Sequence, residues 1–206
     1  MRLRNSILLS LFSEIKSMIN PHFRKFLEQF PELDEAQIEI LAEHIPHREF
    51  KKGSILQKPG VVPHECYQVV QGLLREYRWE DGKDRTLAFY DAQKGTVSSE
   101  YFVSESPAES YLECLEDSLL IVGTKDVDAA NFEKFPILAE ISFKMMELDR
   151  NAQKKDFSNY VGAAPIDRYR LFLKNRPGLI QRVPLHQIAS YLGMTAESLS
   201  RIRKRI

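Results

Sequence analysis

The side chains best suited to chemistry lie near the end of the chain, on a short polar stretch that ends in basic residues. Arg201 can donate two hydrogen bonds to the O6 and N7 atoms of guanine, and Glu197 can accept one from the amino group of cytosine. On a helix these two side chains share one face, because they are four residues apart. Arg203 and Lys204, in the basic run that follows, can pair with phosphates, with a solvated helix end as the alternative. The pattern indicates a surface that reads double-stranded DNA.

Two short helices joined by a tight turn are expected to carry these residues. Pro184 suits the first position of a helix, and Gly193 suits the left-handed position just past that helix's end. Thr195 can cap the next helix, with Glu197 in its first turn. The apolar seam between the helices is formed by Ile188, Ala189, Leu192, Met194, Leu199 and Ile202. The spacing predicts a helix-turn-helix, with an ordinary helical hairpin as the alternative.

Charge is distributed unevenly along the chain. The 206 residues have a formal net charge of zero. Residues 165–206, however, contain nine Lys or Arg against two Asp or Glu, so the rest of the chain is acidic. A basic end on a neutral protein is typical of a DNA-binding unit attached to a module with another task. The length suits two domains.

Other kinds of site are disfavoured by residue type and spacing. Cys66 and Cys114 are too few for a disulfide framework or an iron–sulfur cluster, and the histidines lack metal-ligand spacing, so we expect no metal or cluster. Glu100 and Glu109 form no nucleophile–base set, so we expect no enzyme. The apolar residues 7–12 are too few for a secretory signal, and no run approaches the roughly 20 residues of a membrane span. We expect a cytoplasmic protein with no membrane partner.

The body of the chain is predicted to be antiparallel β-structure preceded by helices. Residues 5–19 have apolar side chains at the spacing of an amphipathic helix, and a second helix begins after Pro31 with Asp34 as its cap. From residue 48 to 124, short β-rich segments alternate with glycine turns, and residues 80–83 predict a hairpin turn. The expected fold class is therefore α+β, with an antiparallel β-barrel or jelly roll.

A long helix is predicted between this barrel and the C-terminal helices. Its apolar residues recur at spacings of three and four, a heptad seam suited to pairing with a second copy. The seam consists of Leu138, Ile141, Met145, Leu148 and Ala152. The alternative is that this stripe packs on the chain's own barrel. We expect a homodimer, because helix-turn-helix proteins commonly bind two half-sites as two-fold dimers. The expected units are residues 1–132 (helices and barrel), 133–158 (dimerisation helix) and 159–206 (DNA-binding domain).

The order of these elements resembles the Crp–Fnr family of bacterial transcription regulators, from about residue 31 to the end. Its most specific part is the terminal motif, where Glu197, Ser200 and Arg201 stand at positions that the fumarate–nitrate branch uses to read bases. Thr195 and Ser198 match positions that usually touch phosphate. The resemblance implies a palindromic DNA operator as a partner, with RNA polymerase as a further one.

The resemblance also implies an effector pocket in a barrel like that of cyclic-nucleotide-binding proteins. Its lining would comprise Tyr90, Ser98, Ser99, Glu100, Glu109 and Ser110. Glu109 stands where the family's phosphate-binding Arg should be, and a carboxylate there repels a cyclic phosphate. We therefore expect no response to cyclic AMP by the usual mode. The expected effector is unknown, with a cationic or neutral polar molecule favoured, and the alternative is an empty pocket in a barrel that serves only as a scaffold. No cysteine precedes Cys66, which disagrees with the N-terminal iron–sulfur cluster of the oxygen-sensing members.

The expected function is a sequence-specific DNA-binding transcription regulator. An effector in the barrel would rotate the two long helices and so set the spacing of the recognition helices. The family usually continues into a β-hairpin wing, whereas this sequence stops at Ile206, so we expect affinity to rest more on Arg203, Lys204 and Arg205. The alternative is a ligand-binding or protein-interaction module whose terminal helices dock a partner instead of DNA.

Overall fold

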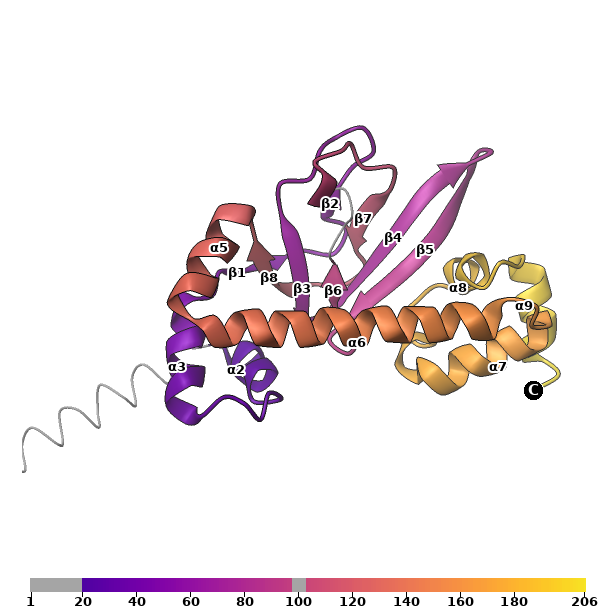
Figure 1. The fold of residues 1–206 in the computed structure, drawn as a ribbon. Coiled ribbons are helices and arrows are strands. Elements are labelled where there is room, and N and C mark those ends of the chain that lie inside the picture. The colour runs from indigo at the N-terminus through magenta and orange to yellow at the C-terminus, as the bar shows by residue number, and fades with distance from the viewer. Residues whose placement is uncertain (1–19, 98–102) are drawn as a thin grey trace, which may run out of the picture.

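The computed structural model describes residues 20–97 and 103–206, beginning with two short helices (Figure 1). Helix α2 (Pro21–Leu27) begins at Asn20, whose side chain accepts a hydrogen bond from a backbone N–H of the first turn. Helix α3 (Glu35–His44) begins at Asp34, which forms a reciprocal capping box with Gln37 at 2.8 and 2.9 Å. This cap confirms the predicted start of the helix. The helix predicted over residues 5–19 lies outside the described residues.

The strands of the described residues form two antiparallel sheets of four strands each. One sheet has the order β1-β8-β3-β6 and the other β2-β7-β4-β5. Their bounds are β1 (His47–Phe50), β2 (Ile55–Gln57), β3 (Cys66–Gln71), β4 (Leu73–Glu80), β5 (Lys83–Asp91), β6 (Thr96–Val97), β7 (Tyr111–Cys114) and β8 (Ser118–Gly123). The predicted antiparallel β-structure is confirmed. Among the described residues the pairing makes two separate sheets, and it does not join them into one closed barrel.

An apolar core lies between the strands of the two sheets. Its buried members include Val69, Leu74, Leu112 and Leu120. Full burial of one such side chain stabilises a fold by roughly 1.5–3 kcal/mol. Cys114 is completely buried in the same cluster, where it packs as a small apolar residue.

Strands β4 and β5 form a long hairpin that extends past the neighbouring strands (Figure 1). Its end pairs Glu80 with Lys83, and the two residues between them, Asp81 and Gly82, have φ values of +50° and +74°. Two successive positive φ angles are those of a type I′ turn, for which Asp-Gly is a favoured sequence. The predicted hairpin turn is confirmed.

The remaining elements are helical. They are α5 (Lys125–Lys134), α6 (Pro136–Tyr160), α7 (Pro165–Asn175), the 3₁₀ helix η1 (Pro177–Leu179), α8 (Leu185–Tyr191) and α9 (Ala196–Arg203). Helix α6 runs beside both the strands and the last helices, and connects α5 to α7 (Figure 1). Within residues 20–97 and 103–206, no helix has the length and apolar character needed to cross a membrane.

The apolar stripe predicted as the dimer seam of α6 is in large part used within the chain. Leu138 and Ile141 are buried and Met145 is half-buried, all in one cluster with side chains of α2 and α3. Leu138 and Ile141 are therefore already covered within the chain, so their assignment to a dimer seam is corrected, whereas Met145, Leu148 and Ala152 stay a prediction. The heptad spacing located an apolar stripe but could not say which surface covers it. Leu148 is 61% exposed at the edge of the stripe, and Ala152 is half-buried.

A different face of α6 leaves large apolar side chains uncovered. Phe143 and Phe157 are 70% and 71% exposed, and Met146 and Val161 are exposed as well. Phe143, Met146, Arg150, Gln153 and Phe157 follow one another at spacings of three, four, three and four. We call these five residues the α6 seam. They repeat the heptad rule on another side of the helix, which begins beside the Leu138 and Ile141 stripe, because Met146 lines the same apolar cavity as those two residues.

The C-terminal helices dock on the β4–β5 sheet. Leu73 of β4 and Phe89 of β5 belong to one buried cluster with Phe172 of α7 and Ile188 of α8. Ser190 of α8 also meets the β5 backbone, because its Oγ accepts a hydrogen bond from the N–H of Thr86 at 2.9 Å. The sheet and these helices therefore share a continuous core.

Candidate nucleic-acid interface

The turn between α8 and α9 is held by its own backbone. The N–H of Met194 donates to the carbonyl of Ala189, and the N–H of Gly193 to that of Ser190, both at 3.0 Å. This is the Schellman pattern, and it needs the left-handed conformation that Gly193 adopts at φ +68°. The predicted glycine turn is confirmed, with one shift: Pro184 is the residue before α8 and does not form its first helical position.

Helix α9 begins at the residue expected to cap it. Thr195 Oγ1 accepts a hydrogen bond from the N–H of Ser198 at 3.2 Å and donates one to the Ser198 hydroxyl at 3.1 Å. The buried Leu199 fixes the opposite side of α9 on the C-terminal core. The helix therefore has one packed side and one side turned to solvent.

The predicted base-contact residues lie on that solvent side. Glu197 and Arg201 are exposed, and Ser200 is half-buried, at positions separated by three and four residues. Arg201 Nη2 donates to Ser198 Oγ at 3.5 Å, a long hydrogen bond that leaves the guanidinium free to meet another acceptor. Hydrogen bonds from its own backbone and from Thr195 lower the pKa of Glu197, with a smaller contribution from the charge of Arg201. The face therefore offers an ionised acceptor beside a forked donor.

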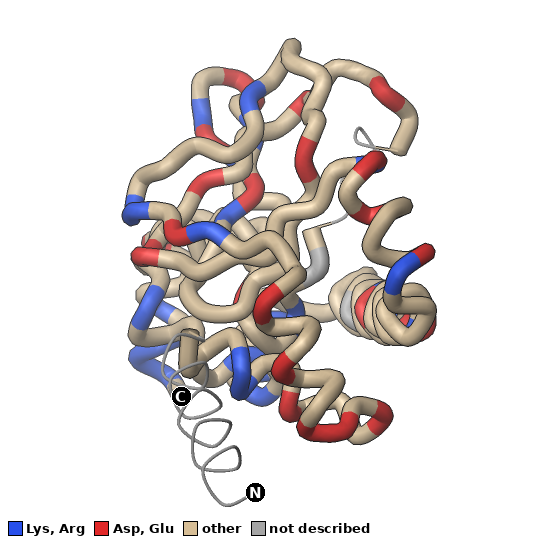
Figure 2. The backbone as a smooth tube through the Cα atoms, turned by 90° about the vertical axis from the view of Figure 1, so that its left-hand side faces the viewer, with Lys and Arg blue, Asp and Glu red and all other residues tan. Residues whose placement is uncertain are grey.

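Basic residues surround this face. Arg203 and Lys204 are exposed in the last turn of α9 and just beyond it. Lys and Arg positions gather in the chain near the C-terminus (Figure 2). The predicted base-contact and phosphate-contact residues are thus brought together on one short helix.

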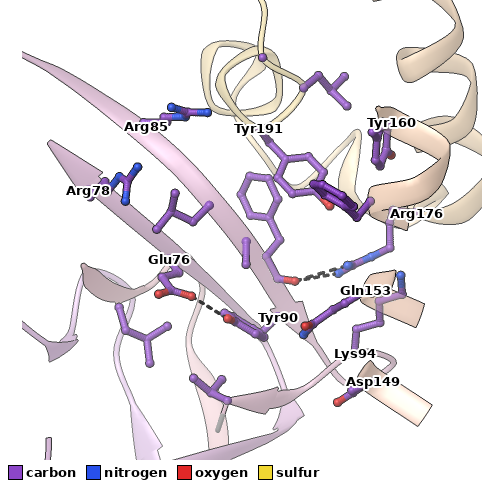
Figure 3. A pocket seen from close by; sticks show the side chains of 18 of the residues that line it. Glu76, Arg78, Arg85, Tyr90, Lys94, Asp149, Gln153, Tyr160, Arg176 and Tyr191 are labelled. Atoms are coloured by element: carbon purple, nitrogen blue, oxygen red, sulfur yellow. Dashed lines mark hydrogen bonds between the residues drawn. The ribbon is translucent and has the colours of Figure 1, made fainter. Parts of the chain in front are cut away.

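A large cavity of about 970 Å³ lies between the β4–β5 sheet, α6 and the turn before α9. Of the predicted effector-pocket residues, Tyr90 and Glu109 line it. Ser110 is buried behind it, while Ser98, Ser99 and Glu100 lie outside the described residues. The cavity also has lining residues that the sequence did not indicate: Glu76, Arg78, Tyr160, Arg176 and Tyr191 (Figure 3).

A hydrogen-bonded carboxylate forms the inner end of this cavity. Glu76 accepts a hydrogen bond from Tyr90 Oη at 2.7 Å (Figure 3) and another from Ser110 Oγ at 2.6 Å. Gln57 in turn donates to the Ser110 hydroxyl at 3.1 Å. Burial raises the pKa of Tyr90 well above its usual value, and the nearby Glu76 charge adds to the shift, so the phenol stays a donor. This part of the wall therefore presents a carboxylate held by two hydroxyl groups, while arginines such as Arg78 and Arg176 line other parts of the cavity.

Several solved structures share this arrangement. A CooA mutant from Carboxydothermus hydrogenoformans is 17% identical over 87% of this chain and 81% of its own, with a TM-score of 0.61. CLP of Xanthomonas campestris, described as a c-di-GMP responsive global regulator, is 18% identical over 84% of this chain and 91% of its own, with a TM-score of 0.60. TTHA1359 from Thermus thermophilus, described as a CRP/FNR-family transcriptional regulator, is 16% identical over 78% of this chain and 84% of its own, with a TM-score of 0.59.

The chain has the Crp–Fnr fold. No protein-family model matches the sequence, and no curated protein matches it. Identity below one fifth makes this a likeness of architecture, so the resemblance stated from the order of the elements is confirmed at the level of the fold.

Glu76 is a cavity residue that its sequence pattern does not single out. Polar and apolar residues alternate in β4, where Glu76 stands on the polar side and Tyr77 and Trp79 stand on the apolar side. In the structure Leu74 and Glu76 face the intersheet core and the cavity, whereas Trp79 is 61% exposed near the hairpin end. A period of two identifies the two faces of a strand, but neighbouring elements decide which one is covered.

Proposed function

We propose that this chain is a homodimeric, sequence-specific DNA-binding transcription regulator of the Crp–Fnr type. The observation that carries the proposal is the solvent face of α9, where Glu197, Ser200 and Arg201 lie on one surface of a capped helix. In this proposal α8 and α9 form a helix-turn-helix with α9 in the major groove. Arg201 pairs with guanine and Glu197 with cytosine, assisted by Ser200. Thr195, Ser198, Arg203 and Lys204 contact the DNA backbone.

The proposed dimer forms through the α6 seam. Its exposed Phe143, Met146 and Phe157 supply the apolar positions, and Arg150 and Gln153 the polar ones. In a parallel pair of helices, Asp149 would stand near Lys154 of the second copy, which adds opposite charges beside the seam. A two-fold dimer of this kind places two recognition helices about 34 Å apart, one turn of DNA.

The proposed effector site is the cavity between the sheet and α6. Glu76 and Glu109 line it, so a cyclic phosphate beside them would meet carboxylates. The arginines of the lining are paired within the chain, Arg78 and Arg85 with Glu80 and Arg176 with Asp91. We expect no activation by cyclic AMP. Because Gln153 and Phe157 of the α6 seam also line the cavity, a second copy would border the same space.

The test is fluorescence-anisotropy titration of the full chain with a panel of palindromic duplexes, at two salt concentrations, with and without cyclic AMP. Tight binding to particular palindromes with a steep salt dependence, unchanged by the nucleotide, is the expected result. Strong enhancement by cyclic AMP would contradict our interpretation of Glu109. An intact dimer without specific binding to any duplex would overturn the DNA-binding proposal in favour of a docking module.

A further inference from the structure

One arginine connects the end of α6 to the turn that precedes α9. Arg168, the half-buried fourth residue of α7, donates from Nε to the carbonyl of Ala163 at 3.0 Å. It also donates from Nη1 to the carbonyl of Leu192 at 3.2 Å. Ala163 belongs to the short link after α6, and Leu192 to the turn between α8 and α9. A single side chain therefore bridges two connections that are 29 residues apart in sequence.

The geometry of the bridge is stiff at both ends. Nε and Nη1 belong to one planar guanidinium, so the two carbonyl oxygens are held in a fixed relation to each other. The turn itself is fixed by its Schellman hydrogen bonds, and a Cβ on Gly193 would lie 3.2 Å from Arg168 Nη1. A displacement of the link at residues 161–164 therefore moves the turn at residues 192–195 with it.

The bridge also borders the cavity. Tyr160 and Val161 on one side, Leu192 and Gly193 on the other, and Arg168 between them all line the same space. A molecule bound in that part of the cavity would lie beside both ends of the bridge. The cavity and the turn before α9 are therefore connected through one side chain, that of Arg168.

We propose that Arg168 is a positioning residue that sets the orientation of α9 relative to α6. This inference rests on the proposed DNA-binding function, which makes that orientation matter. Arg168 does not contact DNA in this proposal. It holds the recognition helix so that the two helices of a dimer fit two half-sites at once.

The first experiment tests the bridge without DNA, by amide hydrogen exchange on the full chain with Arg168→Gln and Arg168→Lys. We expect exchange at residues 161–164 and 192–195 to become about tenfold faster in both variants, as for loss of one ordinary hydrogen bond. Lys keeps the charge but cannot span two carbonyls. The matched control is Arg170→Gln on the same helix, where the exposed Arg170 pairs only locally with Asp167, and it should leave both segments unchanged. Full protection in Arg168→Lys, or faster exchange throughout the C-terminal core, would overturn the bridging role.

The second experiment compares binding to a palindromic duplex with binding to a single half-site. Arg168→Gln should weaken binding to the palindrome about tenfold relative to the half-site, because the base-contact residues are intact but their spacing is no longer held. Suppose that hydrogen exchange shows the bridge to be lost in Arg168→Gln, and that the variant binds both duplexes more weakly by the same factor. That result would contradict a positioning role. If the unmodified chain binds neither duplex, the DNA-binding function fails, and this inference fails with it even where exchange confirms the bridge.

Discussion

Arg201 and Glu197 contribute different information to the proposed complex with DNA. The guanidinium is a forked donor that can satisfy both acceptors of guanine, while the carboxylate can only accept. Because hydrogen bonds lower the pKa of Glu197, its side chain is an anion at neutral pH and repels phosphate oxygens. A register that places Glu197 against the DNA backbone is therefore disfavoured. Base amino groups remain as partners, and that of cytosine is the usual one for a carboxylate.

Replacing Arg201 should change specificity more than affinity. We expect Arg201→Ala to lose roughly 1–3 kcal/mol of discrimination at one base position, since alanine cannot pair with either guanine acceptor. The measurement is competition anisotropy with duplexes that differ by single base pairs. As a contrast, Lys204→Ala should weaken all duplexes alike and reduce the salt slope by about one. A uniform loss from Arg201→Ala would show that this side chain binds only the backbone.

The two cysteines are predicted to be unreactive in the folded protein. Burial raises the pKa of Cys66 to about 12, with Asp128 adding to the shift, and burial raises that of Cys114 to about 11. At pH 8 both are thiols, so we expect slow alkylation by iodoacetamide in native buffer and fast alkylation in denaturant, followed by mass spectrometry. The unfolded thiols ionise first as the pH rises, so these groups stabilise the fold below about pH 9 and lose that contribution above it. Rapid labelling of native Cys66 would contradict this assignment.

At the scale of elements, sequence patterns succeeded where the deciding interaction is local. Asp34 and Thr195 cap their own helices, and Gly193 supplies a positive φ that its own turn requires. The same patterns failed where a distant element decides. The stripe of Leu138 and Ile141 was assigned to a second copy because nothing in its spacing reveals that α2 and α3 cover it. Much of the α9 surface was therefore predictable, whereas most of the cavity lining was not.

The corrected face of α6 makes a direct prediction about assembly. We expect Phe157→Gln to shift the protein toward monomer, because it removes an exposed aromatic side chain from an apolar seam. Leu148→Gln is the matched control, since Leu148 is similarly exposed but lies outside the α6 seam. Sedimentation velocity at several concentrations measures the outcome. If Leu148→Gln were a monomer and Phe157→Gln stayed a dimer, the dimer seam predicted from the sequence, which includes Leu148, would be restored.

Over the whole molecule, the attachment of the C-terminal helices to the sheet depends on charged contacts as well as on the shared core. Arg176 Nη2 donates to Asp91 Oδ2 at 3.0 Å, with both side chains nearly buried, and the same guanidinium reaches the carbonyl of Phe89. Nearby, Arg182 binds Glu116 and donates to the carbonyl of Gly72 at 2.8 Å. These contacts tie the last helices to the β4–β5 pair and to the turns beside it.

Removing one member of the buried pair should cost substantial stability. Arg176→Ala leaves the Asp91 carboxylate nearly buried without its cation, and we expect a loss of about 3–5 kcal/mol in the free energy of unfolding. Denaturant unfolding followed by circular dichroism measures it. The comparison is Lys51→Ala, which breaks an ion pair open to solvent with Asp117 and should leave the midpoint almost unchanged. Equal midpoints for the two variants would mean that the buried pair does not hold the helices in place.

The position of Arg150 in the α6 seam affects how two copies of the chain pair. A basic residue between Met146 and Gln153 weakens pairing with an identical helix, but it also restricts the register in which the helices meet. In an identical pair the two guanidinium groups meet across the two-fold axis, so like charges oppose each other within the seam. Added salt screens that repulsion, so the dimer would persist at ionic strengths that weaken its contacts with DNA phosphates.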